Sequence, residues 1–189
     1  MSMPSPKPMS LPEFLAWEAG QEEKHELIDG FPLPRRLRAM SGGTRRHALI
    51  GANTASVLRS RLRGGPCRAY GSDLKVASPT GRVRYPDALV ECGRGDPTAL
   101  LAIDPKVVIE VLSPSNTFVH QERVLEDYQA IASVDYVIFL HQDQPLAWLW
   151  RREGAAWTRE VVEGLDCELN LAGLDLALPM AELYEGAEV

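Results

Sequence analysis

Two acidic residues stand in neighbouring apolar segments of this 189-residue chain, and their types and spacing suit hydrolytic chemistry. Asp87 follows a proline at the head of "ALV", and Glu110 follows "KVVI" and precedes "VL". An ionised carboxylate in a buried strand is unfavourable unless it is paired or bound to a metal. If the two segments are adjacent strands, both carboxylates can project from one end of a sheet. With a main-chain carbonyl they would form a hard oxygen site for Mg²⁺, which polarises phosphoryl groups and activates water.

Either acid alone is equally well explained as a solvated strand end or as a partner in an ion pair. Two more residues near these segments have both a chemical and a structural explanation. His47 could contact a phosphate or carry a proton, or it could be a half-exposed helix histidine. Asp73 could be a further metal ligand or the cap of a turn. No GxSxG motif surrounds Ser113, so serine catalysis is not favoured.

The elements that would position these residues follow from periodicity and from capping residues. Helices are predicted at Leu11–Ala19 after an N-cap at Ser10, from Thr44 to Gly64–Gly65, and at His120–Ala132. A strand that enters a turn at Asp29–Gly30 is predicted in "HELIDGF", and a hairpin is predicted to turn at Glu153–Gly154. Strands are predicted at Cys67–Gly71, Leu74–Ala77, Arg82–Val90 and Lys106–Leu112. This order predicts an α/β fold with a mixed sheet between helices. Residues 10–189 are expected to form a single domain after a flexible tail at 1–9.

Charge is distributed unevenly along the chain, although the formal net charge is −6. The segment Phe31–Ser72 contains no acidic residue and many arginines, whereas acids predominate from Val90 onward. A basic surface beside an acidic remainder favours a polyanionic partner. The alternative is ordinary solubilising charge.

Several classes of protein are disfavoured by the sequence. No run of 18 apolar residues predicts a membrane span, and the N-terminus does not resemble a secretory signal. Cys67, Cys92 and Cys167 are scattered without a metal-binding spacing. We therefore expect three reduced thiols in a cytoplasmic protein.

The segment "YPDALVEC", followed later by "VVIEVLSPS", resembles the PD-(D/E)XK nuclease superfamily. More narrowly it resembles the Uma-type family of restriction endonuclease-like proteins. Flanking segments extend this likeness from about Leu11 to Glu163. They are "LPEFLAWE", "HELIDG", "MSGGTRRHALIGANTASVLRSRLRG", "CRAYGSDLKV" and "DYQAIASVDYVIFLHQDQP".

The resemblance implies a restriction-endonuclease-like core, which is a mixed central sheet with flanking helices, here with a C-terminal β-hairpin. It also implies metal-dependent hydrolysis of phosphodiester bonds. Asp87 and Glu110 would hold Mg²⁺ or Mn²⁺, and the Val111 carbonyl would be a third ligand. Glu26, in "HELIDG", would hold a metal-bound water.

The sequence departs from the superfamily at its signature lysine, two places after the second acid, where Leu112 stands. In the Uma-type family that this sequence resembles, the signature lysine typically lies in the following helix instead. Arg123, in "VHQERVLEDY", is the best counterpart here, but arginine stays protonated and can only stabilise negative charge. Lys75, in "GSDLKV", is another cation that could reach the site from an adjacent strand.

The leading hypothesis is a Mg²⁺-dependent DNA endonuclease that acts as a homodimer. Its basic segment would lie along the DNA backbone with little sequence preference. The residues expected at that backbone are Arg36, Arg38, Arg45, Arg46 and His47. One alternative is a catalytically degenerate protein of the same fold that serves as a nucleic-acid-binding or structural homodimer. Another is a hydrolase of RNA or small nucleotides.

Overall fold

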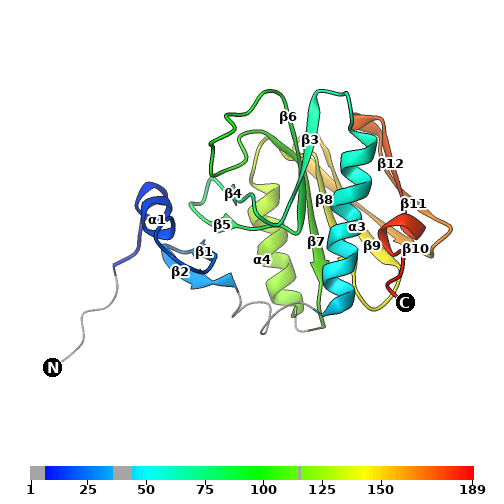
Figure 1. Ribbon diagram of the computed structural model, residues 1–189, viewed down its shortest axis with the longest axis horizontal. Coiled ribbons are helices and arrows are strands. Elements are labelled where there is room, and N and C mark those ends of the chain that lie inside the picture. The colour runs from blue at the N-terminus through cyan, green and yellow to red at the C-terminus, as the bar shows by residue number, and fades with distance from the viewer. Residues whose placement is uncertain (1–6, 36–43, 115) are drawn as a thin grey trace.

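A six-stranded mixed sheet forms the centre of the protein. The structure is a computed structural model, and it describes residues 7–35, 44–114 and 116–189. The strands lie in the order β10-β9-β8-β7-β6-β3 (Figure 1). Only the β7 and β8 pair is parallel within this sheet, and the other neighbours are antiparallel. The predicted mixed α/β fold is therefore confirmed. The strands are β3 (Cys67–Gly71), β6 (Ala88–Cys92), β7 (Pro105–Leu112), β8 (Tyr136–His141), β9 (Leu146–Glu153) and β10 (Ala156–Glu163).

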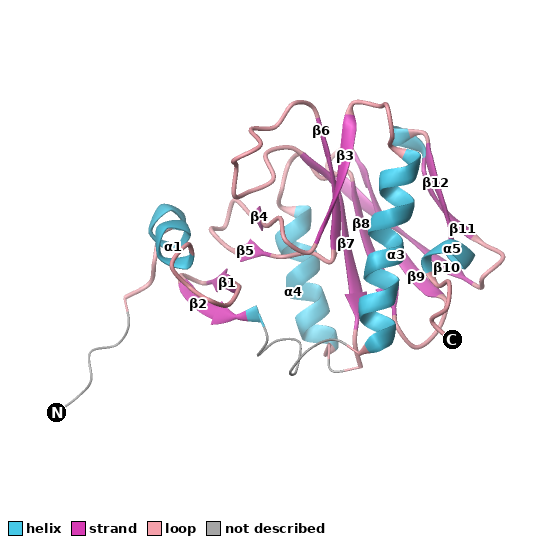
Figure 2. Cartoon of the chain, in the orientation of Figure 1, coloured by secondary structure: helices cyan, strands magenta, loops and turns pink. Residues whose placement is uncertain are grey.

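Two long helices cover opposite faces of this sheet (Figure 2). Alternate side chains of β6 and β7 point to opposite faces, which gives the sheet two apolar cores. On one face, α3 (Arg45–Arg61) buries Ile50 and Leu58 against Val90 and Ile109. On the other face, α4 (Phe118–Gln129) buries Val124 and Tyr128 against Leu89 and Val108.

Side-chain caps fix where both helices begin. Thr44 accepts a hydrogen bond from the His47 amide at 3.2 Å, as the sequence predicts. Thr117 accepts one from the His120 amide at 3.3 Å. Because Thr117 is the cap, α4 begins two residues before the predicted start at His120.

A smaller four-stranded sheet, in the order β2-β1-β5-β4, stands beside the main one. The predicted turn at Asp29–Gly30 joins its first two strands, and both turn residues have positive φ, 52° and 85°. The Met9 amide donates a hydrogen bond to the Gly30 carbonyl at 2.7 Å, and residues 1–6 of the predicted tail lie outside the described residues. The elements here are α1 (Leu11–Glu18), β1 (His25–Ile28), β2 (Phe31–Pro34), β4 (Val76–Ala77) and β5 (Val83–Arg84).

The prediction of one continuous strand at Arg82–Val90 is wrong. The segment divides into β5, which belongs to the smaller sheet, and β6, which belongs to the larger one. Pro86 lies between them and has no amide hydrogen to donate to a ladder, so pairing stops there. This break leaves Asp87 at the head of β6, where its side chain is not confined to the pleat of a strand.

The C-terminal part completes the face covered by α3. β9 and β10 form the predicted hairpin, which turns at Gly154 with φ 63°. A second hairpin follows, and its buried side chains join the core beneath α3. It comprises β11 (Glu168–Leu171), η1 (Ala172–Leu174) and β12 (Leu176–Pro179), and α5 (Met180–Leu183) follows it. Within the described ranges, no helix is long and apolar enough to cross a membrane.

The expectation of three reduced thiols is wrong for two of them. Cys67 and Cys92 form a disulfide, whereas Cys167 is free and exposed. The pairing register of β3 and β6 puts Cys67 directly opposite Cys92, which brings their side chains together. Nothing in the local spacing of the cysteines indicates this, because the bond depends on the register of strands separated by a long connection.

Candidate active site

A pocket of about 100 Å³ lies where the head of β6 and the end of β7 meet the first turns of α3 and α4. β1 and the end of β2 close its remaining side. Its titratable side chains come from segments far apart in the sequence. They are Glu26, Arg35, His47, Arg84, Tyr85, Asp87, Glu110 and His120.

Asp87 is held at the centre of this pocket by three partners. The Val111 amide donates to its Oδ2 at 2.8 Å, so the carboxylate takes the place of a main-chain acceptor beyond the start of β6. Arg35 donates to Oδ1 at 3.1 Å, and His47 Nε2 lies 3.4 Å from Oδ2. The Asp87 side chain is only 9% exposed, so these partners supply most of its polar surroundings.

Glu110 lies beside Asp87 on the adjacent strand. Ala88 pairs with Ile109, and one further step of that register puts Asp87 opposite Glu110. The Tyr128 hydroxyl donates a hydrogen bond to Glu110 Oε1. Burial, and then the negative charge of Asp87, raise the pKa of Glu110 to about 8. Glu110 therefore holds its proton more tightly than an exposed glutamate, whereas Arg35 and His47 balance the charge of Asp87.

His47 supplies a proton-carrying group to the same place. Burial acts to lower the pKa of His47, but the hydrogen bond and charge of Asp87 outweigh it and hold that pKa above the usual value. The main chain of Val111 also accepts a hydrogen bond from the ring. Gly51, one turn further along α3, faces Asp87 too, because a Cβ built there would lie 4.0 Å from the Asp87 Cβ. Small size at this position lets α3 approach the acid.

Glu26 reaches the pocket from β1, as the sequence reasoning expects of a site residue. It is buried and forms an ion pair with Arg84, whose Nη1 lies 3.3 Å from Glu26 Oε2. Arg84 also donates from Nε to Asp127 Oδ2 at 2.7 Å. The charges of Glu26 and Asp127 raise the pKa of Arg84 against the effect of burial. This buried arginine ties β5, β1 and α4 together beneath the two acids.

The order of these residues along the chain matches a known family over most of its length. The Uma2 family model, described as "Putative restriction endonuclease", matches residues 11–181.

The chain belongs to the Uma2 family.

Two proteins illustrate where this Uma2 chain stands. It is 34% identical over 161 residues to the uncharacterised protein slr1290 of Synechocystis sp.. The alignment covers 78% of this chain and 81% of that protein. Its fold is similar to the crystal structure of a protein of Anabaena variabilis described as a putative nuclease of the DUF820 family. That likeness has a TM-score of 0.72 at 20% identity and covers 95% of this chain and 99% of the other. At this identity the second likeness supports the restriction-endonuclease-like fold and no more.

The structure does not bring Arg123 into the pocket. In this Uma2 chain, His120, Gln121 and Val124 of α4 line the pocket of the two acids, whereas Arg123 lines a neighbouring hollow that shares Arg84 and His120 with the pocket. Successive helical residues are about 100° apart, so neighbours in sequence face different directions. The sequence places a cation in the correct helix but on a face that turns away from the acids.

Lys75 is not among the pocket residues either. It is buried, and its ammonium pairs with Glu18 and lies 5.4 Å from the centre of the Tyr85 ring. The Tyr85 hydroxyl also donates to Glu18, at 2.7 Å. Lys75 therefore belongs to a cluster that fastens α1 to the smaller sheet, and its charge is already balanced there.

The residues expected at a nucleic-acid backbone have different environments. Arg46 donates to the carbonyls of Ala187 and Glu188 at 3.1 and 2.9 Å, so it fastens the C-terminal segment. Arg45 is exposed at the start of α3. Arg36 and Arg38 lie outside the described residues. Arg35 stands at Asp87 itself, which the sequence does not reveal, because the link between β2 and β6 depends on the fold.

The donor chemistry of the acidic pair fits a divalent cation. Among residues 7–35, 44–114 and 116–189, no group of three or more histidine, cysteine, aspartate or glutamate side chains could hold a metal ion. Mg²⁺, however, is commonly bound by one or two carboxylates together with water and substrate phosphate. Asp87 and Glu110 offer two such carboxylates in the lining of one pocket.

Proposed function

We propose that this Uma2 protein is a divalent-metal-dependent endonuclease that hydrolyses phosphodiester bonds in DNA. The observation that carries the proposal is the pairing of Asp87 with Glu110 in a pocket that also contains Arg35 and His47. Acids and cations that converge in this way suit a reaction in which a phosphate must be bound and its added charge stabilised.

Asp87 and Glu110 would hold Mg²⁺ or Mn²⁺, with the Val111 carbonyl as a third ligand. When bound, such an ion polarises the phosphate and activates water. Glu26, at the rim of the acidic pair, would orient the attacking water through its carboxylate. Its ion pair with Arg84, at 3.3 Å, holds that carboxylate in one direction.

Arg35 and His47 would bind the scissile phosphate. Both lie against Asp87, at 3.1 and 3.4 Å, so both stand within reach of a group bound to that acid. Arg35 stays charged and can offer two parallel N–H donors to phosphate oxygens. His47 Nε2 holds a proton that can be donated to the departing oxygen. Arg35 would thus stabilise charge where the superfamily resemblance implies a lysine.

The second candidate is a catalytically degenerate protein of this fold that binds nucleic acid or serves as a structural homodimer. It is favoured by the described walls of the pocket, which contain no lysine, and by the two cations that already neutralise Asp87. A homodimer fits both candidates, because a single-domain nuclease that cuts both strands needs two active sites. We also propose that this protein acts in the cytoplasm.

Nicking of supercoiled plasmid in Mg²⁺ or Mn²⁺ tests the proposal. Asp87→Asn is the variant of choice, because an amide oxygen can still accept from the Val111 amide. Asp73→Asn is the matched control, since Asp73 is exposed and pairs only with Lys24 among the described residues. We expect nicking by wild type and the control, and none by Asp87→Asn.

Calorimetric titration with Mn²⁺ separates the two candidates. The enzyme should bind Mn²⁺ in wild type and lose that binding in Asp87→Asn. Absence of Mn²⁺ binding and of nicking in wild type would favour the degenerate protein. Cleavage of RNA in preference to duplex DNA would instead favour the hydrolase of RNA or small nucleotides.

A further inference from the structure

A second basic region lies at the far end of α3 from the pocket. Arg59, Arg63 and Arg68 line a groove of about 510 Å³ between the C-terminal end of α3 and the edge strand β3. Leu62 forms part of its apolar floor, and none of the residues that line it is acidic. Tyr70, whose ring is 37% exposed, lies at its side.

Arg59 and Arg63 of this groove do not stabilise the fold through ion pairs with the described residues. Arg61, on the opposite side of the helix, forms a two-point ion pair with Glu182 of α5 at 2.7 and 2.8 Å. Arg59 and Arg63 are exposed and form no ion pair with the described residues.

Arg68 is likewise free to face the groove. The pairing register puts Glu91 directly opposite Arg68 across β3 and β6, yet the two side chains form no ion pair. Glu91 Oε1 instead accepts from the Asp104 amide at 3.0 Å. Arg68 Nη1 donates to the Gly65 and Cys67 carbonyls at 2.6 and 2.9 Å, which turns the guanidinium toward the end of α3 and leaves Nε and Nη2 without a hydrogen bond among the described residues.

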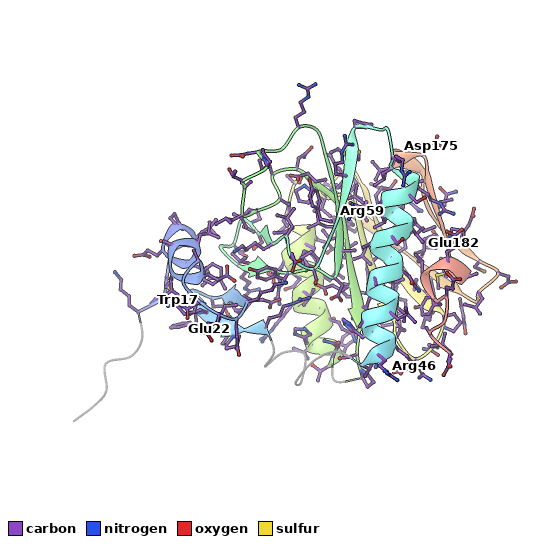
Figure 3. All side chains as sticks on the ribbon, viewed as in Figure 1. Trp17, Glu22, Arg46, Arg59, Asp175 and Glu182 are labelled. Atoms are coloured by element: carbon purple, nitrogen blue, oxygen red, sulfur yellow. A yellow bond between two sulfur atoms is a disulfide. The ribbon has the colours of Figure 1, made fainter. Side chains whose placement is uncertain are left out.

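The outer face of α3 connects this groove with the pocket. Figure 3 shows Arg46 near one end of the helix and Arg59 toward the other. Exposed Ala52 and Ser56 lie between exposed Arg45 and Arg59 on one side of the helix. These small side chains leave room for a rigid rod to lie against α3. From His47 to Arg59 the helix rises about 18 Å, which corresponds to about five base pairs of duplex DNA.

We propose that the groove of Arg59, Arg63 and Arg68 binds backbone phosphates of the same DNA duplex whose scissile phosphate lies at Asp87 and Glu110. This inference rests on the proposed function. Three arginines in a groove whose own lining contains no acid suit backbone phosphates, and Leu62 and Tyr70 suit the deoxyribose between them. No base edge is read here, so the contact contributes affinity and orientation without sequence preference.

Binding of a fluorescent 24-base-pair duplex across a salt series, without divalent metal, tests this site. Arg59→Gln/Arg63→Gln should weaken binding about tenfold or more and lower the slope of log affinity against log salt by about 1.8. Arg68→Gln should lower that slope by about 0.9. Arg61→Gln is the matched control for a single substitution, because it removes one positive charge, as Arg68→Gln does, and should change affinity less than twofold. Thermal unfolding of each variant confirms that it is folded.

The proposal is overturned if Arg61→Gln weakens binding as much as the double variant, since net charge alone would then explain the effect. It is also overturned if wild type does not bind the duplex, or binds single-stranded RNA through these arginines instead. Plasmid nicking keeps this result separate from the proposed function. Suppose that Asp87→Asn abolishes nicking and that Arg59→Gln/Arg63→Gln leaves both kcat and KM unchanged. The groove would then not bind the substrate DNA, whereas the proposed nuclease activity would stand.

Discussion

Glu18 beneath α1 and Glu110 in the pocket are both enclosed by the protein, and their surroundings treat the carboxylate charge in opposite ways. Beneath α1, Glu18 accepts hydrogen bonds from the Tyr85 hydroxyl at 2.7 Å and from the His25 amide at 2.9 Å, and it pairs with Lys75. Burial acts to raise the pKa of Glu18, but these hydrogen bonds, with Lys75 foremost, lower it below the usual value. This carboxylate is satisfied as an anion.

In the pocket, Glu110 receives one hydrogen bond among the described residues, from Tyr128. Burial and the neighbouring charge of Asp87 raise its pKa to about 8. The difference between the two regions teaches that burial of an acid alone does not mark a site. An acid whose charge the fold leaves unbalanced, inside a pocket, is the better indicator of chemistry. By this criterion we propose that Glu110 has a functional role and Glu18 a structural one.

The largest effect expected from this comparison is on cleavage. Glu110→Gln should lower plasmid nicking about 100-fold or more, because loss of a group that only orients a metal ligand already costs about 10–100-fold. Its fold should be retained, since the amide still accepts from Tyr128. Glu18→Gln is the control, and its nicking rate per folded molecule should match wild type. Equal losses in the two variants would erase the distinction between the regions.

The balanced region should instead respond in stability. Lys75→Met leaves Glu18 as a buried anion without its cation, and loss of one partner from a buried pair typically costs about 3–5 kcal/mol. Unfolding by urea should show that loss, and the double variant Lys75→Met/Glu18→Gln should recover part of it. If Lys75→Met kept its stability and lost nicking, Lys75 would be the catalytic cation that the sequence suggests.

The contribution of these ionic contacts to the free energy of unfolding can be compared with that of a disulfide. The Cys67–Cys92 disulfide closes a loop of 25 residues in the unfolded chain. Closure of a loop of this length stabilises a protein by about 3 kcal/mol in the chain-entropy view. Dithiothreitol should lower the free energy of unfolding of wild type by this amount and leave Cys67→Ser/Cys92→Ser unchanged. Cys167→Ser, at the free and exposed thiol, should behave as wild type in both conditions.

Local features of the fold could be predicted from the sequence, because their causes are local. The cap at Thr44 and the turn at Asp29–Gly30 each depend on a few adjacent residues, and both are where the sequence predicts them. The strand at Arg82–Val90 failed for a reason that was also visible. Pro86 cannot donate within a ladder, so β5 ends before it and β6 begins after it.

The acidic pair could be predicted, whereas its partners could not. Asp87 and Glu110 stand out because acids are rare in apolar strands. Arg35, Tyr128 and Arg84 are ordinary in their own segments, and only the crossing of β2, α4 and β5 at the end of the main sheet brings them to the acids. Solvent-facing and pocket-facing cations look alike in sequence.

The smallest effect, and the one that compares the two glutamates most directly, is the dependence of stability on pH. For Glu110 the folded-state pKa, about 8, lies above the usual value of 4.5. The unfolded chain therefore loses this proton first as pH rises, and the contribution of Glu110 to stability falls until pH passes about 8. Between pH 6 and 8 the loss should be on the order of 1–2 kcal/mol.

Glu18 should act with the opposite sign. Its pKa is lowered in the folded state, so its contribution is present above the unfolded value and is lost as pH falls through the folded one. Urea unfolding of wild type, Glu110→Gln and Glu18→Gln from pH 3 to 9 separates the two. Glu110→Gln should remove the decline between pH 6 and 8, and Glu18→Gln should remove part of the decline in acid. A decline between pH 6 and 8 that persists in Glu110→Gln would mean that Glu110 is not the group that titrates in this range.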